Sequence, residues 1–447
     1  MAKYILKGGK FTSKAVDDIL EHKIISFDTE TNGLKVKSYS EEFKVVSIII
    51  STIDNSYYIP VNHRFYDKNI RESRAKDLLQ PIFNDESICL VAHNFNFDRH
   101  VLNRIGLKVQ NKNYFDTLLA ARMINQEDSN SLEALLKREL GIKGLHKFDE
   151  VVGTVSKERK DKVGLSGNSK ATFDLVEINK AAIYGIEDTE NLIDLKVLLE
   201  NRLKEEGLYD IYTNLIVPRF SNVFFNMEDK GVKIDMKELN RISEIISKDV
   251  KETKKEMDEL IGIDINYDSP KQVSELLYNE YSSDPPCEIC KNDVCERKAE
   301  GYCEEYSIWE KYGHKNPNID IREKSFNFPV PERTDTEQPS SGKNALKRFV
   351  HYEPKNEWQE VGLELIDLIL KYKKISKLKS TFVDGLRDAI YEDGKAHPSF
   401  NGLGAKSGRA SSSDPNGQNL PSQDDEDKYK IRKLFIPNRN RKMLAVD

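Results

Sequence analysis

The strongest constraint on the fold is an alternation of short apolar strands and amphipathic helices over the first 207 residues. Three β-branched or aromatic runs, at 23–29 (KIISFDT), 43–51 (FKVVSIIIS) and 56–61 (SYYIPV), predict strands. A fourth run at 87–94 (SICLVAHN) leads directly into a helical pattern, and 177–207 predicts a long amphipathic helix with room for one break. This alternation predicts an α/β domain built on a mixed sheet.

Strand signals fade after residue 207. Residues 208–280 predict helices, and 281–341 are polar, carry four cysteines and show no clear periodicity. Residues 342–395 form a long helical pattern that is rich in lysine in its second half. Residues 396–447 look loop-like until the apolar run Met443–Val446, which predicts a buried strand that ends at Asp447.

Composition indicates a globular protein of two to four domains, with 447 residues, 38% apolar and 32% charged. No run approaches the roughly 18 apolar residues of a membrane span, and the N-terminus lacks a signal peptide. These features predict a cytoplasmic protein without a membrane partner. The net charge is −6, yet residues 341–447 hold 20 Lys+Arg against 15 Asp+Glu. An acidic front and a basic rear fit metal chemistry and phosphate binding, although charge alone does not decide.

The front half contains carboxylates at spacings that suit metal binding. Asp28 and Glu30 end a predicted strand two residues apart, so both side chains share one face and can bind one divalent cation. A solvated strand end would look the same. Asp98 falls in the first turn of a helix that follows Asn94, where the helix dipole alone would favour an acid.

Tyr184 and Asp188 complete this set of residues. They lie four apart in a predicted helix and therefore on one face. A tyrosine and an acid at this spacing are ordinary, and their value comes from the other acids. The order D-x-E, N-x-x-x-D and Y-x-x-x-D, on strand, strand-to-helix and helix, is specific.

These three motifs strongly resemble those of the DEDDy branch of the DnaQ-like 3′–5′ exonucleases, which have an RNase H-like fold. The resemblance implies that two Mg²⁺ or Mn²⁺ ions are bound by four acids, Asp28, Glu30, Asp98 and Asp188. It implies that Tyr184 orients the attacking water, and that Leu34 and Asn94 contact a single-stranded 3′ end. Two such ions would stabilise both the attacking and the leaving oxygens of a phosphodiester displacement.

The rear half resembles family A, or DNA polymerase I-type, polymerases. The segments MEDKGVKID (Met227–Asp235), DSPKQVSELL and KISKLKSTFVDGL match that family in order. The last resembles the thumb, which grips the duplex backbone through phosphate contacts. The resemblance implies DNA contacts by four lysines, Lys373, Lys374, Lys377 and Lys379. A solvated lysine face is the simpler alternative.

The segment SGRASSSDPNGQNLPS (Ser407–Ser422) resembles the family A segment that contacts the primer–template minor groove. The resemblance implies minor-groove and backbone contacts by four polar residues, Arg409, Asn416, Gln418 and Asn419. Long polar side chains suit this task, because minor-groove acceptors look similar for all base pairs. The alternative is a serine-rich surface loop.

One segment has no counterpart in the resemblance. Its spacing C-x2-C-x4-C-x7-C suits a structural Zn²⁺ site. The four ligands would be Cys287, Cys290, Cys295 and Cys303. Free thiols or an iron–sulfur cluster are the alternatives.

The resemblance divides the chain into an exonuclease domain (1–207), a helical linker with the start of the polymerase region (208–280), the cysteine-bearing insertion (281–341), thumb helices (342–395) and a partial palm (396–447). In that palm, Asp447 would bind a polymerase metal ion only together with a partner chain that carries the fingers and the rest of the palm.

Three hypotheses follow. The chain is the proofreading exonuclease and DNA-binding part of a split or truncated family A polymerase, of bacterial or phage origin, that adds no nucleotides alone. Otherwise it is a stand-alone DNA exonuclease, or a non-catalytic DNA-binding assembly subunit. The intact acids and Tyr184 argue against the last of these.

Overall fold

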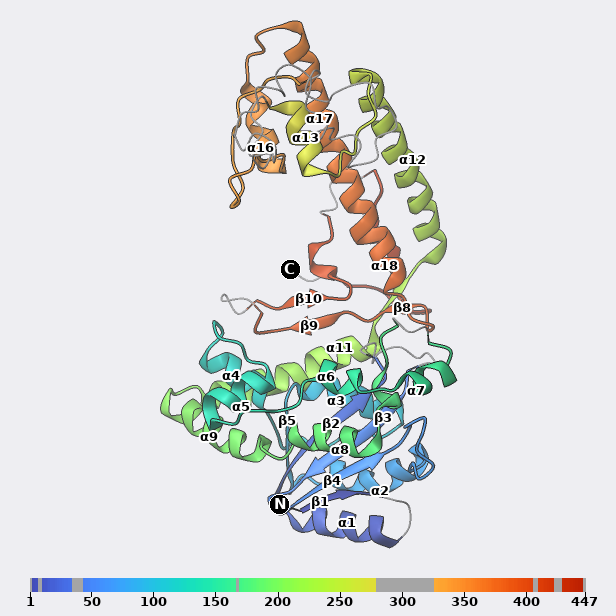
Figure 1. Ribbon diagram of the computed structural model, residues 1–447, viewed down its shortest axis with the longest axis vertical. Helices are drawn as coiled ribbons and strands as arrows, with labels where there is room; N and C mark the ends of the chain where they lie inside the picture. Colours follow the sequence, from blue (N-terminus) through green and yellow to red (C-terminus); the bar gives the residue numbers. More distant parts are fainter. Residues whose placement is uncertain are drawn as a thin grey trace. The chain divides into compact units, whose positions relative to one another are not determined.

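The computed structural model describes residues 2–6, 10–33, 43–165, 169–278, 325–404, 409–421 and 428–444 (Figure 1). The chain divides into two compact units. Unit 1 comprises Met1–Ile234, Ala389–Leu420 and Phe435–Asp447, and unit 2 comprises Asp235–Asp388 and Pro421–Leu434. The finer five-part division expected from the sequence stays a prediction.

Unit 1 is built on a six-stranded mixed sheet, which confirms the predicted α/β fold. Its strands are β1 (Ala2–Ile5), β2 (Ile24–Thr31), β3 (Val45–Ser51), β4 (Asn55–Pro60), β5 (Cys89–Ala92) and β6 (Tyr114–Asp116). The strand order is β1-β4-β3-β2-β5-β6. β2 pairs antiparallel with β3 and parallel with β5, so the direction of the sheet changes at the strand that carries Asp28 and Glu30.

Both faces of this sheet are covered by helices (Figure 1). On β3, Ile48 and Ile50 pack into one core and Ile49 into the other, which explains why the strand is apolar at consecutive positions. One core includes residues of α1 (Lys10–Glu21), α2 (Glu72–Asn84), α3 (Phe95–Arg104), α4 (Thr117–Ile124), α5 (Leu132–Leu140) and α9 (Leu192–Glu205). The other includes residues of α6 (Phe148–Gly153), η1 (Phe173–Leu175) and α8 (Ile178–Glu187). The exposed helix α7 (Lys157–Lys162) lies between α6 and η1 in the sequence.

The long helix predicted over 177–207 is broken once, as the sequence allowed. α8 ends at Glu187, and α9 begins at Leu192. The break places Asp188 at the C-terminal end of α8, directly above the sheet. The position of this acid is therefore set by a helix end rather than by a helix interior.

The segment after α9 is helical up to Lys230, as predicted. It runs through α10 (Tyr209–Ile211), the π-helical turns η2 (Tyr212–Ile216) and η3 (Arg219–Phe224), and α11 (Phe225–Lys230). Pro218, which has no N–H to donate, lies between the two π-helical turns. Gly231 ends the helix with φ +60°, and a Cβ there would lie 2.6 Å from the His397 ring.

The region from residue 396, predicted to be loop-like, contains more structure than expected where it is described. β8 (Lys395–Ala396) and β11 (Phe435–Ile436) flank β7 (Val232–Ile234) in a three-stranded sheet. β9 (Ser399–Asn401) pairs with β10 (Ser411–Ser413), which is followed by the short helix η8 (Gly417–Asn419). The predicted final strand is wrong where it is described: Met443 and Leu444 form no strand and are exposed, and no strand of the described residues pairs with them.

Unit 2 is mainly helical. It contains α12 (Met236–Ile261), α13 (Pro270–Leu277), α16 (Lys343–Lys347), η6 (Arg348–His351), α17 (Glu357–Lys377), η7 (Leu378–Asp384), α18 (Gly385–Asp388) and η9 (Ile431–Leu434). Ser269 caps α13 by accepting from the Gln272 N–H at 3.4 Å, and Pro270 occupies the first turn. Tyr267, Phe326 and Phe328 fill the core against α17. Among the described residues, no helix is long and apolar enough to span a membrane.

Candidate active site

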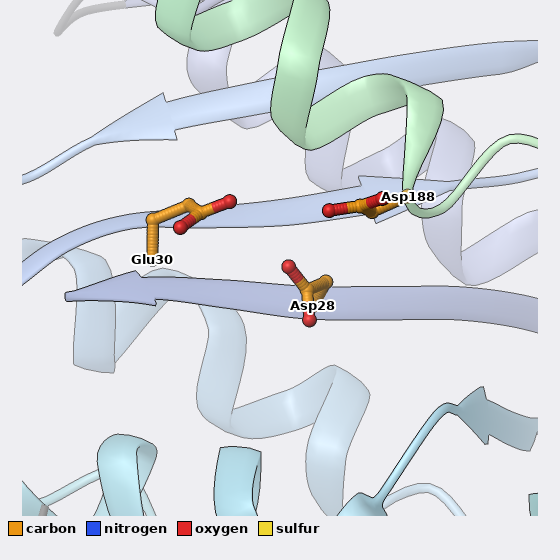
Figure 2. Close-up of side chains that lie close together, drawn as sticks. All are labelled: Asp28, Glu30 and Asp188. Atoms are coloured by element: carbon orange, nitrogen blue, oxygen red, sulfur yellow. The ribbon is translucent and has the colours of Figure 1, made fainter. Parts of the chain in front are cut away.

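Three carboxylates from two elements meet above the sheet of unit 1. Asp28 and Glu30 project from β2, and Asp188 projects from the end of α8, so that their carboxylate groups face one another (Figure 2). One oxygen of each lies within 4.8 Å of the other two. Sequence periodicity correctly placed Asp28 and Glu30 on one face, and the break after α8 brings in Asp188.

The electrostatics of this group favour a bound cation. Burial, followed by the charges of neighbouring acids, raises the pKa of Asp28 and Glu30 well above their usual values. Burial also raises the pKa of Asp188 to about 7. Several partly buried carboxylates that repel one another are costly to ionise together. A divalent cation with oxygen ligands fits this donor set and would remove the repulsion.

Helix α8 approaches the sheet closely because of Gly185. A Cβ at this position would lie 2.9 Å from Ile49 Cγ1, closer than ordinary contact. Buried hydroxyl groups then fix the helix end to the strands. Ser26 Oγ donates to the Thr189 carbonyl at 2.8 Å, and Ser51 Oγ lies 2.7 Å from Thr189 Oγ1. The distance between Asp28 and Asp188 is therefore set by direct hydrogen bonds one or two residues away.

Asp98 adjoins the three carboxylates but is oriented differently. It lies in the first turn of α3 and is only 1% exposed. Its Oδ1 accepts from the Thr29 amide at 3.1 Å and from the Thr29 hydroxyl at 2.6 Å. Its charge helps to raise the pKa of Asp28 and Glu30, and burial raises its own pKa to about 8. The close group found among the described residues comprises Asp28, Glu30 and Asp188 without Asp98.

The start of α3 is organised by an acid to which sequence reasoning assigned no role. Asn94 precedes the helix with φ 72°, and its N–H donates to Asp116 Oδ1 at 3.1 Å. Asp116 also accepts from the Phe95 N–H at 2.9 Å and from the Leu118 N–H at 2.9 Å. It therefore caps α4 and ties the start of α3 to it. The only sequence signal for this role was an acid placed just before a helical pattern.

Tyr184 lies beside Asp188, to which its hydroxyl donates a hydrogen bond. Burial and the nearby carboxylates raise its pKa, so the phenol stays protonated at neutral pH. Its ring centroid lies 5.8 Å from that of Phe173 and 6.3 Å from that of Phe148. Phe148 is 46% exposed and lies edge-on to the Tyr184 ring. Sequence reasoning missed it, because an isolated phenylalanine carries no motif.

The four lysines predicted to contact DNA differ in their surroundings. Lys373 Nζ donates to the Ser341 carbonyl at 2.6 Å, and burial lowers its pKa. Lys379 pairs with Asp384 at 2.6 Å. Lys374 and Lys377 are exposed on α17. Within unit 2, two of the four are thus engaged by the protein itself and two face solvent.

The residues predicted to contact the minor groove lie on and beside the short helix η8 of unit 1. Asn416 Oδ1 accepts from the Gln418 N–H at 3.1 Å and from the Asn419 N–H at 3.3 Å, and so begins this helix. The Gln418 carboxamide donates to the Ala410 carbonyl at 3.0 Å. Arg409 is exposed. The remaining predicted residues, Leu34, Cys287, Cys290, Cys295, Cys303 and Asp447, lie outside the described residues.

Two parts of the chain match known protein families. Residues 6–204 match the family model of a 3′–5′ exonuclease, and residues 321–447 match that of DNA polymerase family A. Together the two matches support a 3′–5′ exonuclease domain followed by part of a family A polymerase. The acidic group lies entirely within the exonuclease match, which confirms the predicted exonuclease domain.

Individual relatives agree with this assignment. DNA polymerase I of Rhizobium leguminosarum is 26% identical over 446 residues, which cover 95% of this chain and 36% of the relative. DNA polymerase DpoZ of Acinetobacter phage SH-Ab 15497 is 25% identical over 448 residues, covering 96% of this chain and 60% of that protein. The chain thus spans about a third to three fifths of the length of these relatives.

A solved structure shares the fold. The POL domain of Pol1 from M. smegmatis, in complex with DNA primer-template and dNTP, aligns with a TM-score of 0.64 and 17% identity. The alignment covers 98% of this chain and 58% of that one. At 17% identity, this structural similarity is evidence for the fold alone.

Proposed function

We propose that this chain removes 3′-terminal nucleotides from DNA by divalent-metal-dependent hydrolysis, as the proofreading exonuclease and DNA-binding part of a family A polymerase. The observation that carries the proposal is the meeting of Asp28, Glu30 and Asp188 within 4.8 Å inside the exonuclease match. Tyr184 beside Asp188 supports it, because the hydroxyl of a protonated phenol can donate or accept a hydrogen bond at the site.

The residues would have distinct roles. Asp28, Glu30, Asp98 and Asp188 would bind two Mg²⁺ or Mn²⁺ ions. Such ions, when bound, supply electrostatic stabilisation of the attacking and leaving oxygens of the scissile phosphate. Tyr184 would orient the attacking water. Leu34 and Asn94 would contact the single-stranded 3′ end.

The acids are tested by substitution. We expect the wild-type chain to degrade single-stranded DNA in Mg²⁺ or Mn²⁺ but not in EDTA, and Asp98→Ala to lose at least a hundredfold in rate. Asp77→Ala, on the exposed side of α2, is the matched control and should retain the wild-type rate. Absence of wild-type hydrolysis would instead favour a non-catalytic DNA-binding assembly subunit.

DNA contacts by unit 2 are proposed through Lys374 and Lys377, the exposed pair on α17. Each phosphate contact releases counterions, so removing one should lower the salt dependence of binding by about one unit of slope. We expect Lys374→Gln with Lys377→Gln to weaken duplex binding equally for unrelated sequences. Lys251→Gln, exposed on α12, is the control. Arg409, Asn416, Gln418 and Asn419 are proposed to contact the primer–template.

The polymerase half is proposed to act only with the fingers and the rest of the palm, supplied by a partner chain or by further residues of a longer protein. Asp447 would then bind a polymerase metal ion. We expect no template-directed primer extension by residues 1–447 alone, and extension by this chain would refute the requirement for a partner. If the chain is instead a stand-alone exonuclease, its rate of DNA hydrolysis should be the same with and without such a partner.

The cysteine-bearing insertion is proposed to hold a structural Zn²⁺ through Cys287, Cys290, Cys295 and Cys303. Elemental analysis of the purified chain should find about one zinc per chain. Less than half an equivalent would contradict this proposal and leave the exonuclease proposal unaffected.

A further inference from the structure

Thr29 separates the two acids of the D-x-E motif and contacts a third. It lies on β2 between Asp28 and Glu30, and the alternation of a strand directs its side chain away from theirs. Thr29 is 5% exposed, so its hydroxyl is shielded from water. Both of its donors converge on one atom, Asp98 Oδ1, from the amide at 3.1 Å and from the hydroxyl at 2.6 Å.

We propose that Thr29 is a positioning residue of the exonuclease site, which holds Asp98 Oδ1 so that Oδ2 is presented to the divalent cation. This inference rests on the function proposed above. Two donors from a single residue fix the rotation of the carboxylate more firmly than one donor can. Hydrogen bonds to a ligating carboxylate orient it in this way in metal sites generally.

Asp98 requires this restraint more than the other three acids do, because its element is not part of the acid-bearing strand. Asp28 and Glu30 belong to the same strand, and Asp188 is tied to that strand through Ser26 and Thr189. Asp98 comes from a different element, α3, and faces like charges that would turn an unrestrained carboxylate away. The donors of Thr29 are the direct link described between this carboxylate and the acid-bearing strand.

A purely structural role for the hydroxyl is the competing explanation, in which it anchors α3 to the sheet. That helix is already anchored by other contacts. At its start, the Asn94 and Phe95 amides donate to Asp116. Further along, the Asn96 side chain donates to the Phe220 carbonyl at 3.0 Å and the Arg99 side chain to the Ser221 carbonyl at 2.7 Å. The His100 ring lies 2.9 Å from the Glu228 carboxylate. The strand that carries Thr29 is also held in register with β3, where Thr29 lies opposite Ile48. Loss of one hydroxyl should therefore leave the helix in place.

The test compares Thr29→Val with Thr29→Ser. Valine keeps the branched shape and the amide bond but removes the hydroxyl, whereas serine keeps the hydroxyl. Mn²⁺ binding is measured without DNA by electron paramagnetic resonance, and the hydrolysis rate is measured against Mn²⁺ concentration. We expect Thr29→Val to bind Mn²⁺ and to hydrolyse DNA about 10 to 100 times more weakly. Thr29→Ser should stay within about threefold of wild type.

Two further measurements make the outcome decisive. Hydrogen exchange of α3 shows whether Thr29→Val keeps this helix in place, and Thr52→Val removes another buried hydroxyl, at the end of β3, as the control. Unchanged Mn²⁺ binding and hydrolysis in Thr29→Val would overturn the inference, as would loss of α3 protection that parallels the loss of binding. If wild type binds Mn²⁺ but hydrolyses no DNA, the proposed function fails, while Mn²⁺ binding by the two variants still tests Thr29.

Discussion

Replacement of Asp188 by asparagine should stabilise unit 1 when no metal ion is present. Burial raises the pKa of this carboxyl from 3.8 to about 7, so the folded state binds its proton more tightly than the unfolded state. Each unit of pKa corresponds to about 1.4 kcal/mol, which gives a destabilisation of at most about 4 kcal/mol once the group is ionised. Because the folded pKa is raised, this cost is absent below pH 4 and grows as the pH rises to 7. Asparagine carries no charge and still accepts from Tyr184.

The free energy of unfolding is best read from hydrogen exchange of the β2 amides, which reports on unit 1 alone. At pH 8 in EDTA, we expect Asp188→Asn to be more stable than wild type by about 1–4 kcal/mol. Addition of Mn²⁺ should stabilise wild type more than the variant, because the variant has lost one charged ligand. Asp194→Asn, an exposed acid in the first turn of α9, is the matched control and should change stability by less than about 1 kcal/mol in both conditions.

Two results would refute this reasoning. One is a variant less stable than wild type in EDTA at pH 8, which would show that burial does not disfavour the ionised Asp188 carboxylate. The other is an equal gain from Mn²⁺ in both proteins, which would show that Asp188 does not bind the ion.

Two further predictions concern stability. Burial lowers the pKa of His63 to about 4, so wild type should lose about 3 kcal/mol more than His63→Gln as the pH falls from 6.5 to 4, measured by chemical denaturation; parallel pH profiles would contradict this. Gly362→Ala should lower the stability of unit 2 by about 1–2 kcal/mol, because the new Cβ would lie 2.6 Å from the Phe326 ring. Urea unfolding followed by tryptophan fluorescence measures this change. A gain in stability, which helix propensity alone predicts, would contradict it.

The sheet of unit 1 could be predicted from sequence where long apolar runs define it. β3 is apolar on both faces, and β5 leads directly into a clear helical pattern, so their positions were evident. The short pair β9 and β10 was missed, because a run such as Ser411–Ser413 becomes a strand only through a partner ten residues away. The strand predicted at Met443 and Leu444 was wrong for the opposite reason. These residues have strand-like side chains, but no strand among the described residues pairs with them.

Sequence patterns predicted which residues of the candidate site lie close together, but not how each side chain is oriented. Strand periodicity was sufficient to place Asp28 and Glu30 together, and helix periodicity placed Tyr184 beside Asp188. The orientation of Asp98 toward Thr29 could not be predicted, because it depends on how α3 packs against β2. Likewise, a lysine-rich pattern does not reveal that Lys373 donates to a carbonyl inside unit 2 while Lys374 faces solvent.

The central claim is that the acids of unit 1 remove nucleotides from a DNA 3′ end, and product analysis on 5′-labelled single-stranded DNA tests it most directly. We predict a ladder of labelled products that shorten one nucleotide at a time in Mg²⁺ with wild type, and an intact strand with Asp28→Asn or in EDTA. Early release of the label from the 5′ end, internal cuts, or an undiminished ladder with Asp28→Asn would contradict the account.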